Sequence, residues 1–232
     1  MADKLPDAKR RTDIDAFLDR LAAVPAVAGG GRGRLIFALD ATASREGTWA
    51  RAQELHAEMF IAAAALGGLD VQLVYYRGLG ECKASAWTGS PDRLLGLLSK
   101  VACVGGETQI ARVLGHARDE ARRGKVDALV FVGDCMEENV DGLCALAGEL
   151  GLMGVPAFLF HEGDDATAAR AFAQMAKLSG GACCRFDASA ADQLRALLRA
   201  VAVYAAGGRK ALAELGRREG GLVLQITHQM GA

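Results

Sequence analysis

The residues best suited to chemistry are a carboxylate and two hydroxyl groups that follow the first strongly apolar run of the chain. Residues 35–39 (LIFAL) lead into Asp40, and Thr42 and Ser44 come two and four residues later. Side chains at this spacing on a tight loop between a strand and a helix can all face one point. Hard divalent cations such as Mg²⁺ and Mn²⁺ prefer oxygen donors of this kind. The motif therefore predicts a metal site.

Two later segments are expected to bring further oxygen donors to the same place. Residues 128–132 (ALVFV) form another apolar run, and Gly133 and Asp134 follow it directly. Thr108 comes shortly after a pair of glycines, where a helical pattern begins. Because ligands of open α/β sheets bind at the carboxyl ends of the strands, these donors should meet at one edge. The candidate metal ligands are Asp40, Thr42, Ser44, Thr108 and Asp134.

Each of these side chains also has an ordinary structural interpretation. Asp40 or Asp134 alone could cap a helix, and Thr108 alone suits a helix N-cap, because Ser, Thr and Asp are preferred at helix starts. The three segments together are more informative than any one of them. A carboxylate-hydroxyl loop, a glycine-rich turn with a threonine, and a second aspartate after a later strand favour a metal site over coincidence.

The elements that must position these donors alternate between short apolar runs and longer stretches of helical period. The expected strands are residues 35–39, 71–76, 128–132, 155–160 and 182–186. The expected helices are residues 49–66, 110–121, 140–150, 166–178 and 191–205. Strands that are apolar on both faces are typical of a sheet covered on both sides. The alternation predicts a doubly wound, mostly parallel, Rossmann-like α/β sheet with helices on both faces.

One segment departs from the alternation. Residues 80–87 (GECKASAW) follow the strand at 71–76 after a link that is too short for a parallel crossover. They are therefore expected to pair antiparallel, as an edge strand.

Both ends of the chain are expected to be additions to a central domain. Residues 12–24 have an amphipathic helical pattern, and the glycine-rich stretch 28–34 (AGGGRGR) separates them from the first strand. Residues 210–217 and 222–228 suggest an added helix and strand. The predicted organisation is an N-terminal helical extension and glycine-rich joint at 1–33, a domain at 34–206, and a C-terminal helix-strand extension at 207–232.

Composition excludes several classes of protein. The chain of 232 residues carries 27 Lys and Arg against 28 Asp and Glu, a formal net charge of −1, so binding of nucleic acid by phosphate neutralisation is not expected. No apolar run approaches the ~20 residues of a membrane helix, and the first residues are charged. The expected location is the cytoplasm. The six cysteines show no C-x-x-C spacing and are interpreted as buried thiols.

The pattern D-x-T-x-S, then T, then D resembles the von Willebrand factor A domain with its metal-ion-dependent adhesion site, in its intracellular bacterial form. The resemblance covers about residues 34–205. It implies a non-enzymatic interaction module that holds Mg²⁺, or Mn²⁺ or Ca²⁺, at the five candidate ligands. A partner protein would complete the coordination with an Asp or Glu, and an AAA+ ATPase of the MoxR group is a partner class that the resemblance suggests. Neither nucleic acid nor a membrane is expected as a partner.

The sequence departs from the family pattern in two places. Thr42 stands where a serine is usual, which keeps the oxygen and adds a methyl group. The loop after the strand at 128–132 reads GDCMEE in place of the commoner S-D-G, so a thiol, Cys135, and two carboxylates, Glu137 and Glu138, lie near the site. The carboxylates could accept hydrogen bonds around the metal, or supply negative charge at the start of the helix expected near Val140. We favour the helix-start interpretation.

An alternative function is a Mg²⁺-dependent phosphatase or phosphotransferase of the haloacid-dehalogenase type. Asp40 would then be the nucleophile, Thr42 would occupy the acid/base position, and Asp134 with Glu137 or Glu138 would hold the metal. A threonine cannot act as a general acid near neutral pH, and the glycine-rich loop has no role in this interpretation. A generic aryl phosphate assay distinguishes the two functions.

Other polar residues near the predicted edge carry weaker expectations. His161 and Glu162 follow the strand at 155–160 and could lie near a ligand or partner surface. Arg45, Trp49 and Arg51 could border a docking surface, although Trp49 fits the buried stripe of its helix better.

Overall fold

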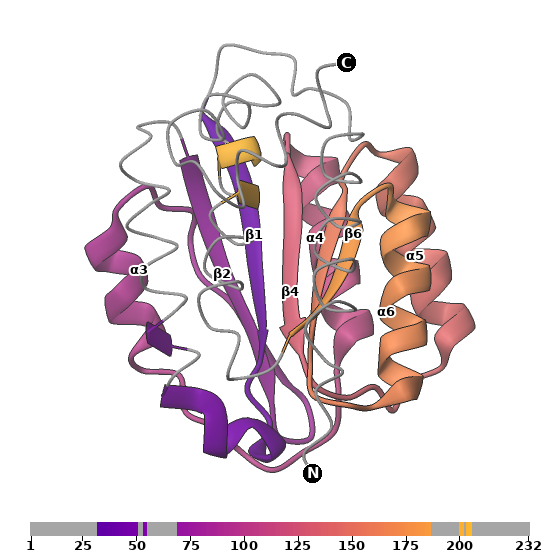
Figure 1. Ribbon diagram of the computed structural model, residues 1–232. Coiled ribbons are helices and arrows are strands. Elements are labelled where there is room, and N and C mark those ends of the chain that lie inside the picture. The colour runs from indigo at the N-terminus through magenta and orange to yellow at the C-terminus, as the bar shows by residue number, and fades with distance from the viewer. Residues whose placement is uncertain (1–31, 51–52, 55–68, 187–199, 202, 206–232) are drawn as a thin grey trace, which may run out of the picture.

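The computed structural model describes residues 32–50, 53–54, 69–186, 200–201 and 203–205. Its centre is a sheet of six strands in the order β3-β2-β1-β4-β5-β6 (Figure 1). The strands are β1 Gly33–Asp40, β2 Leu69–Arg77, β3 Glu81–Ala84, β4 Ala128–Gly133, β5 Ala157–Glu162 and β6 Ala182–Phe186. All neighbouring pairs are parallel except β2 with β3. The predicted α/β fold class is confirmed.

Strand β1 shows why the central strands are apolar on both faces. Successive side chains of a strand point to opposite sides of the sheet. Phe37 belongs to one buried cluster, whereas its neighbours Ile36 and Ala38 belong to another on the opposite face. All three side chains are fully buried. Burial of a side chain the size of Phe or Ile contributes about 1.5–3 kcal/mol, so β1 is stabilised from both sides.

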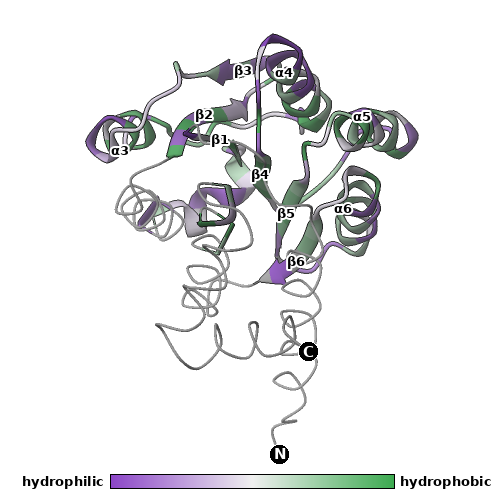
Figure 2. Ribbon diagram, turned by 90° about the horizontal axis from the view of Figure 1, so that it is seen from above, coloured by the Kyte–Doolittle hydropathy of each residue, from purple (hydrophilic) through white to green (hydrophobic). Residues whose placement is uncertain are grey.

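Helices cover the two faces of the sheet unequally in the described part of the chain. They are α3 Pro91–Leu98, α4 Ile110–Arg123, α5 Val140–Leu152 and α6 Ala166–Ser179. Figure 2 shows α4, α5 and α6 on one side of the sheet and α3 on the other. Leu94 and Leu98 of α3 pack in the same cluster as residues 200–201 and 203–205. Helix α3 was not expected from the sequence, although Ser90 caps it and Pro91 occupies its first turn, both common at helix starts.

The antiparallel edge strand is confirmed and is shorter than expected. Strand β3 pairs with β2 from Arg77 opposite Glu81 to Val74 opposite Ala84. Gly78 makes the turn between them with a φ of 59°, a conformation that glycine adopts readily. Beyond Ala84 the chain keeps one main-chain hydrogen bond to β2, from the N–H of Ser85 to the oxygen of Leu73, and Thr88, just past the predicted segment, forms an isolated bridge with Val71.

Several of the expected elements cannot be compared with the structure. The helix at 12–24, most of the helix at 49–66, residues 191–199 and the C-terminal extension lie outside the described residues. Within the described part, no helix is both long enough and apolar enough to cross a membrane.

Arg45 joins the carboxyl ends of three strands. Its guanidinium donates to the Glu162 carboxylate from Nε at 3.0 Å and from Nη2 at 2.8 Å. Its Nη1 donates to the main-chain oxygen of Asp40 at 3.0 Å and, more weakly, to that of Val132 at 3.5 Å. Because Arg45 is only 1% exposed, the expectation that it borders a docking surface is wrong. The carboxylate of Glu162, at the end of β5, pairs with the Arg45 guanidinium and stabilises it in the buried position. Trp49 is buried, as its pattern favoured.

The buried pair gives a first prediction. Glu162→Ala should lower the free energy of unfolding by about 3–5 kcal/mol, because it leaves the Arg45 guanidinium buried without its counter-charge. The double variant Arg45→Met with Glu162→Leu should lose much less than the sum of the single variants. Urea unfolding of each variant measures both effects.

Arg122→Ala is the matched control, because Arg122 makes its ion pairs with Asp119 and Glu149 on the exposed surface. Surface pairs contribute little, so this variant should unfold close to the native protein. Equal losses in Arg122→Ala and Glu162→Ala would contradict a structural role for the buried pair.

Candidate metal centre

The loop after β1 holds its three predicted donors in one connected chain. The main-chain N–H and the hydroxyl of Thr42 both donate to Oδ1 of Asp40, at 2.8 and 2.6 Å. The Thr42 hydroxyl also lies 3.0 Å from the hydroxyl of Ser44. A short 3₁₀ turn, η1 Ala43–Arg45, sets this arrangement by turning the chain directly after the strand. The spacing in the sequence thus places the carboxylate and both hydroxyls together.

Tyr76 fixes the other oxygen of Asp40. It ends the apolar run of β2, lies opposite Asp40 in the parallel ladder, and donates from its hydroxyl to Oδ2 at 2.8 Å. Burial raises the pKa of Asp40, the bonds from Thr42 and Tyr76 oppose the rise, and the nearby charge of Asp134 adds to it. Burial and the Asp40 charge also raise the pKa of Tyr76 well above its ordinary value, so the phenol stays a donor. The role of Tyr76 could not be predicted from the sequence, because this residue looks like one more member of a buried strand.

Asp134 lies at the end of β4 and approaches Asp40 closely. The carboxylates of Asp40 and Asp134 and the thiol of Cys135 place one ligand atom each within 4.8 Å of one another. Oδ1 of Asp134 is buried and has no hydrogen-bond partner among the described residues. A buried carboxylate oxygen without a partner is costly, and two neighbouring carboxylates repel each other. A divalent cation would relieve both costs, so the residues present fit a metal ion.

Thr108 is attached to the loop that follows Asp134. Its hydroxyl accepts from the main-chain N–H of Glu137, and its own N–H donates to Oε2 of Glu137, both at 3.1 Å. Among the described residues, no direct hydrogen bond joins Thr108 to the other four candidate ligands. Its hydroxyl accepts one bond, which leaves a lone pair for a further ligand.

The structure corrects the expected role of Glu137 and Glu138. The carboxylate of Glu138 accepts from the main-chain N–H groups of Ile110 and Ala111, at the start of α4. The expectation that a carboxylate of this loop lies at the start of a helix was thus right. The helix is α4, however, and not the one that begins near Val140. Helix α5, which follows in sequence, is capped by Asn139 instead. Negative charge at the start of α4 is favourable, and here it also joins two loops.

The glycine-rich loop is held on its other side by the ends of β1 and β2. The N–H of Val104 donates to the main-chain oxygen of Ala41 at 3.0 Å. The amide of Gln109 donates to the main-chain oxygens of Arg77 and Gly78, at 3.2 and 3.0 Å. A Cβ added to Gly106 would lie 2.1 Å from the oxygen of Gly78, so this close approach requires glycine. All five candidate ligands therefore belong to one edge of the sheet, called here the carboxyl edge.

Cys135 lies beside both aspartates. Its thiol is half-buried, and burial, followed by the charges of Asp134 and Asp40, raises its pKa to about 12. Without a cation beside it, the thiol is therefore protonated at neutral pH. Interpreting every cysteine as a small apolar residue overlooks this position.

His161 supports the loop of Asp134 from behind. Its Nε2 lies 3.1 Å from the main-chain oxygen of Asp134, so this nitrogen carries the proton and donates. The ring is fully buried and packs edge-on against Phe172. Burial lowers the pKa of His161 and favours the neutral ring. His161 thus contacts the candidate site through the main chain of Asp134. Glu162, which was also expected near a ligand or partner surface, pairs with Arg45 instead.

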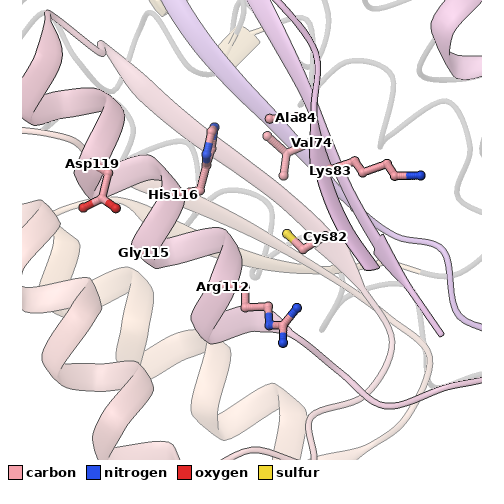
Figure 3. Close-up of a pocket in the computed structure, with 8 residues that line it drawn as sticks. All are labelled: Val74, Cys82, Lys83, Ala84, Arg112, Gly115, His116 and Asp119. Atoms are coloured by element: carbon pink, nitrogen blue, oxygen red, sulfur yellow. The ribbon is translucent and has the colours of Figure 1, made fainter. Parts of the chain in front are cut away.

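A separate cavity of about 380 Å³ lies between β3 and α4 (Figure 3). Cys82, Arg112 and His116 line it. Arg112 donates to the main-chain oxygen of Gly80, and His116 lies 2.8 Å from the side-chain oxygen of Gln72. These polar groups already have partners within the fold, and none of the five candidate ligands lines this cavity.

Comparisons with known proteins find likeness in structure alone. No protein-family model and no curated protein matches the chain. The SpRpn10 VWA domain is similar, with a TM-score of 0.57 at 12% identity over 73% of this chain and 95% of that one. A von Willebrand factor type A protein from Catenulispora acidiphila has a TM-score of 0.54 at 15% identity, over 73% and 42% of the two chains.

A minor pilin, PilB from Streptococcus sanguinis, has a TM-score of 0.56 at 9% identity over 77% of this chain. The chain spans only 62% of the length of that pilin. At such low identities the likeness shows the fold and nothing finer. The order of the strands, the single antiparallel edge strand and these matches agree: this chain has the α/β fold of the von Willebrand factor A domains.

Proposed function

We propose that this chain is a metal-dependent protein-interaction module with no catalytic activity of its own. A divalent cation, Mg²⁺ or another hard ion, is held by Asp40, Thr42, Ser44, Thr108 and Asp134. An Asp or Glu of a partner protein completes its coordination. The observation that carries the proposal is the buried, unpartnered oxygen of Asp134 beside the buried carboxylate of Asp40.

The charges of the site support a partner of acidic chemistry. Two carboxylates balance the charge of one divalent cation, so a third carboxylate can approach without strong repulsion. The net charge of the chain is −1, which gives no general attraction for an acidic protein. Recognition would depend on the cation itself, at short range.

The surroundings of the site supply an open side. Ser44 is exposed and Asp134 is partly exposed, whereas Asp40 is fully buried. Leu79 and Val104 are 86% and 44% exposed, and both belong to loops at the carboxyl edge. A carboxylate flanked by an apolar side chain suits such a surface. A MoxR-type AAA+ ATPase is the partner class that the family resemblance suggests.

The phosphotransferase alternative receives less support from the geometry. A nucleophilic aspartate needs an oxygen open to the phosphorus atom. Asp40 is fully buried, and its two oxygens accept three hydrogen bonds from Thr42 and Tyr76. The Thr42 hydroxyl donates to Asp40 itself, so it is not positioned to protonate a leaving group.

Metal binding should appear as stabilisation. Mg²⁺ at 100-fold above its Kd should increase the free energy of unfolding of the native protein by about 2.7 kcal/mol. The melting temperature should rise accordingly. Asp134→Asn should remove this response, because it takes away a charged ligand. Differential scanning fluorimetry across a Mg²⁺ series measures the shift.

Asp119→Asn is the control, since Asp119 is a partly exposed carboxylate on α4. It should respond to Mg²⁺ as the native protein does. An equal response in Asp134→Asn and the native protein would contradict the metal assignment.

Partner recognition is tested with displayed peptides. Peptides selected on the immobilised protein in Mg²⁺ and eluted by a chelator should be rich in Asp or Glu. Replacing the acidic residue of a selected peptide by its amide should reduce binding more than tenfold, as should Asp134→Asn in the protein. Peptides that bind equally well with and without chelator would contradict a metal-mediated interaction.

The enzymatic alternative has its own assay. With Mg²⁺ and a generic aryl phosphate, the native protein should show no turnover beyond that of Asp40→Asn. Turnover that is abolished by Asp40→Asn would establish the phosphotransferase instead.

A further inference from the structure

We propose that the thiol of Cys135 is a further ligand of the cation, so that the site favours Zn²⁺ over Mg²⁺ more strongly than an oxygen-only site would. The inference rests on the proposed metal site and concerns which ion that site selects. It assigns a role to the one sulfur atom that lies within the group of candidate ligands described above.

The three donor atoms are close enough for one ion to draw them together. Three atoms that are bound to one Zn²⁺ at about 2.0–2.3 Å lie about 3.3–4.0 Å apart. The Sγ of Cys135 and carboxylate oxygens of Asp40 and Asp134 all lie within 4.8 Å of one another. A contraction of about 1 Å or less between these atoms would therefore allow all three residues to share an ion.

The main chain that carries the thiol is held in place. Cys135 directly follows Asp134, whose main-chain oxygen lies 3.1 Å from Nε2 of His161. Two residues further on, the N–H of Glu137 donates to the hydroxyl of Thr108. The main chain is thus held by hydrogen bonds on both sides of Cys135, which keeps this residue beside the aspartates. Ligands held in this way bind a metal with less loss of freedom.

The chemistry of a thiol differs from that of the other donors. Thiolate is a soft ligand that suits Zn²⁺ and Co²⁺, whereas Mg²⁺ accepts oxygen almost exclusively. On binding, the S–H bond breaks, a sulfur–metal bond forms, and the proton passes to the buffer. The two aspartates and one thiolate then hold the cation from three sides, with the hydroxyls of Thr42 and Ser44 close by.

No other cysteine of the described residues offers this arrangement. Cys82, Cys103, Cys144 and Cys183 are half-buried too, and none of them belongs to a comparable group of carboxylates and thiols there. Cys144 lies on α5, does not belong to the group of candidate ligands, and provides a matched control.

Cobalt spectroscopy tests the inference directly. Addition of Co²⁺ to the native protein should produce a near-ultraviolet thiolate-to-cobalt charge-transfer band together with visible ligand-field bands. Cys135→Ser should lose the charge-transfer band, and Cys144→Ser should keep it. Asp134→Asn should weaken the same band, because the thiol and the carboxylate bind one ion.

Affinities give a second measure. In Cys135→Ser, competition titrations should show a loss of at least tenfold in Zn²⁺ affinity and a change of less than threefold in Mg²⁺ affinity. Cys135→Ala provides the same comparison should the serine variant fold poorly, as judged by circular dichroism. Equal losses for the two ions would overturn the inference.

The remaining outcomes separate this inference from the proposed function. Ligand-field bands without a charge-transfer band in the native protein would overturn the thiol ligand and leave the metal site standing. A charge-transfer band that survives Cys135→Ser, or that Asp134→Asn leaves at full intensity, would place the sulfur elsewhere and also overturn it. Absence of any response to Mg²⁺, Zn²⁺ and Co²⁺ would overturn both proposals.

Discussion

The buried ion pair of Arg45 and Glu162 is the interaction on which the arrangement of the carboxyl edge depends. It ties the loop after β1 to the end of β5, and the same guanidinium donates to main-chain oxygens at the ends of β1 and β4. Among the described residues, no hydrogen bond joins Arg45 to the carboxylates of Asp40 and Asp134, because its donors go to Glu162 and to main-chain oxygens. The two aspartates are thereby left for the proposed cation.

Hydrogen bonds to main chain then join the loops of this edge into one unit. Glu137 and Glu138 connect the loop after β4 to Thr108 and to the start of α4. Val104 and Gln109 connect the same glycine-rich stretch to the ends of β1 and β2. The proposed metal site would need this kind of support, because a displacement of about 1 Å would separate ligands that share one ion.

The sequence predicts those features that depend on local pattern and on the topology of a parallel sheet. Strands such as β1 and β4 are apolar on both faces, so their type and approximate ends could be predicted, and with them the positions of Asp40 and Asp134. The role of Arg45 could not, because its burial depends on Glu162, a partner 117 residues away. Glu138 was assigned to the helix that follows it in the sequence, whereas its carboxylate accepts hydrogen bonds from the start of α4. The position of Tyr76 followed from the strand pattern, but its bond to Asp40 depends on the register between β1 and β2.

The outer edge of β3 has a consequence for how the molecule associates. This strand has only four residues, and Lys83 on it is largely exposed and pairs with Glu81. Short edge strands that carry lysine resist pairing with a strand of another molecule. Such pairing, edge to edge, is a common route by which β-sheet proteins aggregate. On this side the protein is therefore protected against indiscriminate pairing, so that attachment to another molecule depends on side chains rather than on exposed backbone.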